Sequence, residues 1–142
     1  MMDRPRRFLA VAGLLALASC ATPPQPMLYD RLGGLPALTA VVDKTLDSAA
    51  RDPRTSRSFQ GIKLQGVKES VVEQLCEATG GPCKYRGATM RRVHEDLEIS
   101  DAEFDAFGQQ LASVLDGFQV GAREKHELLQ LLAPMKRDIV TR

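Results

Sequence analysis

Apolar residues recur with the spacing of a helix along four stretches of the chain, at positions 38–49, 64–78, 104–118 and 128–139. In each stretch they fall three or four positions apart, so that one side of the helix is apolar and the other polar. The one alternating stretch, 62–64, is too short to predict a strand. The chain is therefore predicted to be all-α.

Helix-breaking residues mark where these stretches begin and end. Asp52-Pro53 ends the first stretch, and Gly80-Gly81-Pro82 ends the second. Ser100 and Glu103 have the spacing of a capping box at the start of the third. Pro134 lies inside the fourth stretch and is expected to kink or split that helix.

The segment between the second and third stretches is weakly periodic and carries His94 on a short predicted helix at 89–96. A single imidazole beside an apolar interior is suited to bind a haem iron. Considered alone, such a histidine is more often a surface residue or a hydrogen-bonded core residue, so the residue itself leaves these interpretations open. The other histidine, His126, is flanked by Lys125 and Glu127 and is expected to face solvent.

Composition excludes several classes of function. A length of 142 residues suits one domain and excludes a multidomain enzyme. The net charge of +1 gives no basic field for nucleic acid, and 5% aromatic residues leave few rings to stack on bases. With two histidines, one of them expected in solvent, no catalytic triad can be assembled. We therefore expect no nucleic-acid partner.

The N-terminus has the layout of a secretory signal peptide. Arg4, Arg6 and Arg7 precede an apolar run at 8–18, shorter than the roughly 20 residues that span a bilayer. The run ends in Leu17-Ala18-Ser19-Cys20, which resembles a bacterial lipobox, in which the cysteine is lipidated. An ordinary signal peptide cleaved nearby, with Cys20 incidental, is the alternative.

We divide the chain accordingly into a lipoprotein signal peptide at 1–19, a lipid anchor with a proline-rich spacer at 20–27, and a folded domain at 28–142. The lipid would tether the domain to the membrane on the periplasmic side. Ala21, directly after the cysteine, favours the outer membrane over the inner one in the lipoprotein pattern.

Cys76 and Cys83 are the other two cysteines of the chain. In an oxidising compartment they are expected to form a disulfide across the turn between them. The alternative is two unpaired thiols that pack as small hydrophobic groups. Two thiolates with no further cysteine or histidine nearby fall short of the four ligands of a structural metal site.

Several spaced motifs resemble those of group I truncated haemoglobins. They are the opening 28–34 (LYDRLGG), the corner 80–82 (GGP), the loop 84–87 (KYRG), the histidine motif 90–94 (MRRVH) and the entry to the next long helix at 97–105. The resemblance extends over about 28–140 and needs no gap as far as His94.

The resemblance implies a two-over-two helical sandwich that holds haem b, with His94 as the proximal iron ligand. It places Phe59 on the face of the haem, and Tyr85 and Met90 at its proximal border. Basic side chains near the rim would pair with the haem propionates. The candidates are Lys84, Arg91 and Lys63, although any surface lysine suits that role equally well.

The distal side departs from the family pattern, which has a phenylalanine followed by a tyrosine on the second helix, and glutamines followed one turn later by a phenylalanine on the facing helix. The aligned positions here are Thr45 and Leu46 on the second helix and Val67, Ser70, Val71 and Gln74 on the facing one. Leu46, Val67 and Val71 would make an apolar pocket without the usual donors to dioxygen. Thr45 or Gln74 could still reach the ligand if its helix is rotated, which is the open alternative to an apolar pocket.

Three functions remain open. The leading one is a haem protein that reversibly binds oxygen or another diatomic gas, carbon monoxide or nitric oxide. The second is a haem enzyme that detoxifies nitric oxide or peroxide and needs an external reductase. The third is a haem-poor interaction module that keeps only the fold. The His94 motif and Phe59 argue against the third.

Overall fold

The computed structural model describes residues 24–142, so the predicted signal peptide and Cys20 lie outside the described residues. Two short 3-10 turns, η1 (Ser56–Phe59) and η2 (Ala133–Met135), interrupt the α-helices. The α-helices are α1 (Leu28–Arg31), α2 (Gly34–Ala49), α3 (Leu64–Ala78), α4 (Met90–His94), α5 (Asp101–Gly117), α6 (Ala122–Leu132) and α7 (Lys136–Ile139). Within 24–142 β-type pairing is limited to an isolated parallel bridge between Ile99 and Val140.

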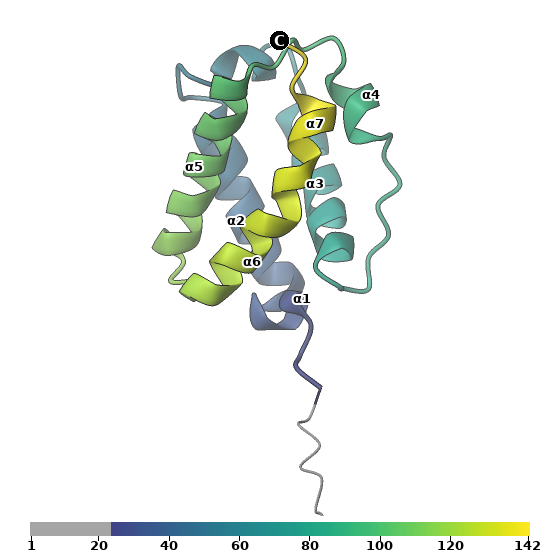
Figure 1. The fold of residues 1–142 in the computed structure, drawn as a ribbon, viewed down its shortest axis with the longest axis vertical. Helices are drawn as coiled ribbons and strands as arrows, with labels where there is room; N and C mark the ends of the chain where they lie inside the picture. The colour runs from purple at the N-terminus through teal and green to yellow at the C-terminus, as the bar shows by residue number, and fades with distance from the viewer. Residues whose placement is uncertain (1–23) are drawn as a thin grey trace, which may run out of the picture.

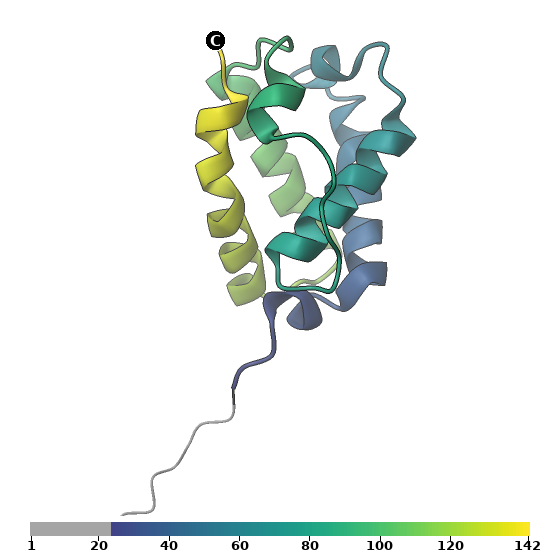
Figure 2. The same ribbon diagram turned by 90° about the vertical axis from the view of Figure 1, so that its right-hand side faces the viewer.

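The long helices form two layers. Helix α2 packs on α3 and on α5, and α5 packs on α6. Figure 1 shows α2 and α3 behind α5 and the α6–α7 pair, and the view in Figure 2 separates the same two layers. An ion pair joins the two helices of the α2–α3 layer, since Lys68 Nζ on α3 lies 2.9 Å from a carboxylate oxygen of Asp47 on α2. The all-α, two-over-two prediction is confirmed.

The predicted helix boundaries are confirmed at several positions. Gly33 and Gly34, at the start of α2, have φ angles of 98° and 69°, a region that favours glycine. The Ser100 side chain accepts from the Glu103 backbone N–H while the Glu103 side chain accepts from the Ser100 N–H, so the capping box is formed. Around Pro134 the last helix splits into α6, η2 and α7.

The core lies where α2, α5 and α6 meet. Leu38, Leu115 and Leu128 are among the largest fully buried side chains, one from each of these helices. Burying a leucine stabilises a fold by roughly 1.5–3 kcal/mol relative to leaving it exposed. Phe118 departs from the predicted stripe, since it is 48% exposed. It lies beyond the last residue of α5, where the helical spacing no longer directs it inward.

A corner at the end of α3 joins the N-terminal segment to the domain. The Tyr29 N–H donates to the Thr79 carbonyl at 2.9 Å, and the Tyr29 Oη accepts from the Leu35 N–H at 3.0 Å. A disulfide joins Cys76 and Cys83 across the same corner, with Cα atoms 5.6 Å apart. Within residues 24–142 no helix is both long and apolar enough to cross a membrane.

Candidate functional site

His94 is the last residue of α4, a five-residue helix capped by Thr89, whose hydroxyl accepts from the Arg92 N–H at 3.3 Å. The imidazole is half-buried, and its Nδ1 lies 2.7 Å from the carbonyl oxygen of Met90. With a carbonyl as partner, Nδ1 must carry the proton and donate it. In the neutral imidazole Nε2 is then the nitrogen without a proton, and within 24–142 no hydrogen bond reaches it. This is the arrangement in which a histidine binds a metal through Nε2 while its other nitrogen fixes the orientation of the ring.

Residues distant in sequence support α4, because five residues are too few for a stable isolated helix. Arg91 forms an ion pair with Asp138 of α7 at 2.8 Å, and α4 packs on α7 beside the C-terminus (Figure 1). After α4, the carbonyl of Ile99 accepts from the Thr141 N–H at 3.0 Å. The histidine helix is thus held by the last residues of the chain.

Arg57 of η1 supports the same segment from the other side. Its guanidinium donates to the carbonyls of Leu97 and Glu98 at 2.9 and 3.0 Å and to the Glu103 carboxylate at 2.8 Å. Glu98 has a φ of 48°, a left-handed conformation that costs energy for a residue other than glycine. Arg57 therefore stabilises the sharp turn that directly follows α4. Sequence reasoning missed Arg57, which lies in a short polar run with no periodicity.

Glu103 is the anionic centre of this network. Burial raises the pKa of the Glu103 carboxyl, but hydrogen bonds from the Ser100 N–H and hydroxyl and from Arg57 outweigh burial and lower the pKa to about 2. Arg142 also reaches this carboxylate, at 3.3 Å. The start of α5, the turn after α4 and the C-terminus are therefore joined at one carboxylate.

Phe59 belongs to the same 3-10 turn as Arg57 and is half-buried against the core cluster. On α3, Val67 and Val71 are also half-buried and packed on that cluster. Leu46 on α2 is buried within the cluster. These apolar side chains come from three different elements and all belong to, or pack on, one core cluster. Leu46, Val67 and Val71 are the three that the sequence predicts for an apolar pocket. Ser70, which the alignment also places on the distal side, is exposed.

Gln74 has neighbours that its sequence position did not reveal. Its side-chain N–H group points to the sulfurs of Met90 and Met135, with Nε2 3.2 and 3.6 Å from the two Sδ atoms. Met90 is the residue whose carbonyl accepts from His94. In this structure Gln74 therefore contacts Met90, the residue that orients the histidine.

The predicted rim residues have different surroundings. Lys84 Nζ pairs with Glu77 at 3.1 Å, and Arg91 pairs with Asp138, whereas Lys63 is exposed and forms no ion pair within 24–142. Tyr85 is half-buried and its Oη donates to the Ala88 carbonyl at 2.8 Å. His126 is exposed, as predicted.

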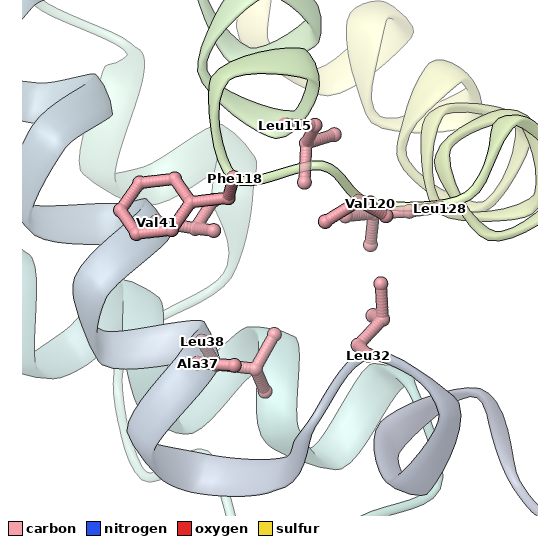
Figure 3. A pocket seen from close by; sticks show the side chains of 8 residues that line it. All are labelled: Leu32, Ala37, Leu38, Val41, Leu115, Phe118, Val120 and Leu128. Carbon is pink, nitrogen blue, oxygen red and sulfur yellow. The ribbon is translucent and has the colours of Figure 1, made fainter.

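A small cavity of about 80 Å³ lies at the opposite end of the helices, between α1, α2, α5 and α6. Its lining side chains are all apolar, and Figure 3 shows Leu32 and Leu115 pointing into it from opposite sides. None of the predicted site residues lines it. It therefore offers no group for chemistry or for binding a metal.

The donor set and the apolar side chains described above fit a haem. Haem is a flat, largely apolar group bound through its iron, and the chain presents one oriented imidazole together with the apolar side chains of Phe59, Val67 and Val71. Among residues 24–142 no cluster of three or more His, Cys, Asp or Glu side chains is arranged to hold a metal ion. In haem the porphyrin itself supplies four ligands to the iron, so the protein needs to supply only one histidine.

Comparison with known proteins points to the same cofactor. The family model for the bacterial-like globin matches residues 27–141. A group 1 truncated haemoglobin, GlbN, of Mycolicibacterium paratuberculosis is 33% identical over 114 residues, which cover 80% of this chain and 84% of the relative. A second one, from Nostoc sp., is 29% identical over 115 residues, covering 81% of this chain and 98% of the relative.

Solved structures agree on the fold. The truncated haemoglobin of Tetrahymena pyriformis in its Fe(III) form has a TM-score of 0.79 at 23% identity, covering 82% of this chain and 100% of that one. The 2/2 haemoglobin of Synechococcus sp. PCC 7002 has a TM-score of 0.78 at 26% identity with the same coverage. The helical layers, the oriented histidine and these matches lead to one conclusion: the chain belongs to the bacterial-like globin family, among the truncated haemoglobins, and its cofactor is haem iron.

Proposed function

We propose that the protein holds haem b through Nε2 of His94 and binds a diatomic gas reversibly on the opposite face. The hydrogen bond from His94 Nδ1 to the Met90 carbonyl, 2.7 Å long, is the observation that carries this proposal. It fixes the tautomer and the ring orientation that an iron ligand needs. The haem iron supplies an open coordination position for the gas.

The apolar side chains on α2 and α3 support a distal side with little hydrogen bonding. A tyrosine at the position of Leu46 would donate to dioxygen, whereas Leu46, Val67 and Val71 carry no donor. Dioxygen acquires partial negative charge when it is bound, so it depends on such donors more than carbon monoxide and nitric oxide do. We therefore expect selectivity to shift towards the latter two gases.

The remaining site residues act on the cofactor itself. Phe59 would pack on the haem face, and Met90 and Tyr85 would border the proximal side. Of the three predicted propionate partners, Lys63 has the most accessible charge, because Lys84 and Arg91 already pair with Glu77 and Asp138 in the described part of the chain.

The absorption spectrum of the purified, haem-reconstituted protein tests the haem site. We expect a Soret band that is lost in His94→Ala. His126→Ala is the matched control, since His126 is exposed on α6, and it should leave the band intact. If the band is absent in the unmodified protein, or persists in His94→Ala, the proposed ligand is wrong, and absence favours a haem-poor interaction module.

Turnover separates gas binding from detoxification. Nitric oxide consumption is measured in the presence of oxygen and a reductant. We expect binding without sustained consumption, because no polar side chain at positions 46, 67 or 71 is available to hold oxygen for that reaction. Sustained catalytic consumption would favour the enzyme and would require a reductase as partner.

We also propose that Cys20 is lipidated and tethers the domain on the periplasmic side, preferably at the outer membrane. The sequence at 17–20 supports this, and a disulfide between Cys76 and Cys83 is typical of an oxidising compartment. Palmitate labelling followed by membrane fractionation tests the anchor. Cys20→Ala should abolish labelling and membrane retention, whereas Ser19→Ala, which keeps the cysteine, should retain both.

A further inference from the structure

Three buried side-chain atoms in the described part of the chain have no hydrogen-bond partner: Thr45 Oγ1, Ser58 Oγ and Gln110 Oε1. Gln110 is otherwise well bonded, since its Nε2 donates to Asp52 at 2.7 Å and to Thr55 at 3.2 Å. Thr45 differs from Gln110 because the hydroxyl is its only polar side-chain atom, and from Ser58 because the residue is only 2% exposed whereas Ser58 is half-buried. Buried hydroxyls without partners are rare in native folds, because their desolvation is not compensated.

Other threonines of the same chain show what a helical hydroxyl normally does. Thr39, one and a half turns earlier on α2, donates to the Leu35 carbonyl at 2.9 Å. Thr79, directly after α3, donates to the Leu75 carbonyl at 2.7 Å. Both bonds reach back four residues, the usual bond for a threonine in a helix. Thr45 lies well inside α2 yet does not form this bond, so its hydroxyl remains available to a partner from outside the fold.

The position of Thr45 indicates where the hydroxyl lies. Thr45 belongs to the buried face of α2, together with Val41, Val42, Leu46 and Ala49, and this helix packs on α3 and α5. Leu46, the next residue, is the one that replaces the distal tyrosine. Among the buried residues of α2 the Thr45 hydroxyl is therefore the one polar side-chain group, and it lies next to a residue of the proposed gas-binding face.

We propose that Thr45 is the hydrogen-bond donor of the gas-binding pocket and sets its selectivity. Its O–H donates to the diatomic ligand, which supplies the partner that the fold itself does not provide. The bond favours dioxygen over carbon monoxide, because dioxygen carries more negative charge on its outer atom. Thr45 thus offsets part of what the protein loses by having Leu46 instead of a tyrosine. This inference rests on the proposed haem site.

Thr45→Val tests the proposal, because valine has nearly the same shape without the hydroxyl. In the haem-loaded protein we expect dioxygen to dissociate roughly tenfold faster, as for the loss of one hydrogen bond. The carbon monoxide stretching frequency should rise, since a nearby donor lowers it. Thr45→Ser, which keeps a donor, should restore both values towards those of the unmodified protein.

The haem-free protein gives an independent measurement. If the hydroxyl has no partner in the fold, Thr45→Val should leave the urea unfolding midpoint unchanged or raise it. Thr79→Val is the matched control: it removes a buried hydroxyl that donates to Leu75, so it should lower the midpoint and leave the gas kinetics unchanged. Ser58→Ala removes another unpartnered hydroxyl and should also leave the kinetics unchanged.

Each result decides the proposal. A haem-loaded Thr45→Val protein with unchanged dissociation rate and stretching frequency would overturn it while leaving the haem site intact. A lower unfolding midpoint in haem-free Thr45→Val would also overturn it, since the hydroxyl would then have a partner within the fold. A shift in Ser58→Ala without one in Thr45→Val would place the donor on η1 instead. If no Soret band forms in the unmodified protein, the proposed haem site fails, and this inference fails with it.

Discussion

Breaking the disulfide between Cys76 and Cys83 should destabilise the domain by an amount set by the length of the loop that it closes. The two cysteines are seven positions apart. In the chain-entropy model, a loop of about 8 residues corresponds to about 2.5 kcal/mol in the free energy of unfolding at 25 °C. With an unfolding entropy of about 2.1 cal/mol/K per residue, this lowers the melting temperature by about 10 °C.

Urea unfolding of the haem-free domain, followed by circular dichroism with and without a reductant, measures this difference. Cys83→Ala is the preferred variant, because Cys83 is half-buried whereas Cys76 is fully buried and its replacement would also open a cavity. We expect reduction and Cys83→Ala to give similar losses. Mass spectrometry without a reductant verifies that the starting protein is oxidised.

The chain-entropy model attributes the stabilisation by the disulfide to a restricted unfolded chain, so helix content in the native state should not change on reduction. Two results would refute the reasoning. One is a loss below about 0.5 kcal/mol, far under the chain-entropy value. The other is a large fall in native helix content, which would mean that the bridge maintains the folded corner itself.

Three further predictions concern other parts of the fold. Gly81→Ala should lower the free energy of unfolding, measured by urea unfolding, by about 1–3 kcal/mol, because an added Cβ would lie 2.5 Å from the Tyr29 ring and 2.7 Å from Cys76 Sγ. Gly66→Ala is the control: an added Cβ there has no neighbour within 4 Å, so this variant should instead stabilise α3 by about 0.5–1 kcal/mol. Because the pKa of Glu103 is lowered to about 2, its ionised form stabilises the fold at pH values above the ordinary pKa of a glutamate, and that stability is lost as pH falls from about 4.5 to about 2. In Glu103→Gln the urea unfolding midpoint should depend less on pH across this window. An unchanged pH dependence would contradict the proposed hydrogen bonds and ion pairs of Glu103. Leu46→Tyr should slow dioxygen release by roughly one to two orders of magnitude in stopped-flow experiments, and an unchanged rate would contradict the apolar distal side.

The sequence was sufficient for features that depend on neighbouring residues. The helical stripe at 38–49 predicted the buried face of α2, and the Ser100–Glu103 spacing predicted the capping box that the structure contains. Pro134 was expected to split the last helix, and it does. These features are local, because helical spacing and capping involve residues within one or two turns of each other.

Features that depend on distant partners were not predictable. Arg57 contacts residues about 40 positions later, and nothing in its polar surroundings distinguishes it from other surface arginines. Gln74 was grouped with the distal positions by its place on α3, yet its neighbours Met90 and Met135 come from other elements. The unpartnered hydroxyl of Thr45 likewise became visible only when the side-chain directions were known.

The support of α4 by the C-terminal residues has a consequence for how the protein is made. Arg91 pairs with Asp138, and Ile99 accepts from Thr141, so the histidine helix depends on a segment that leaves the ribosome after it. The layers formed by α2, α3 and α5 can pack before that segment exists. We expect a nascent chain that stops before 138 to be folded in part but unable to retain haem, so that cofactor capture waits until residues 138–141 have been synthesised.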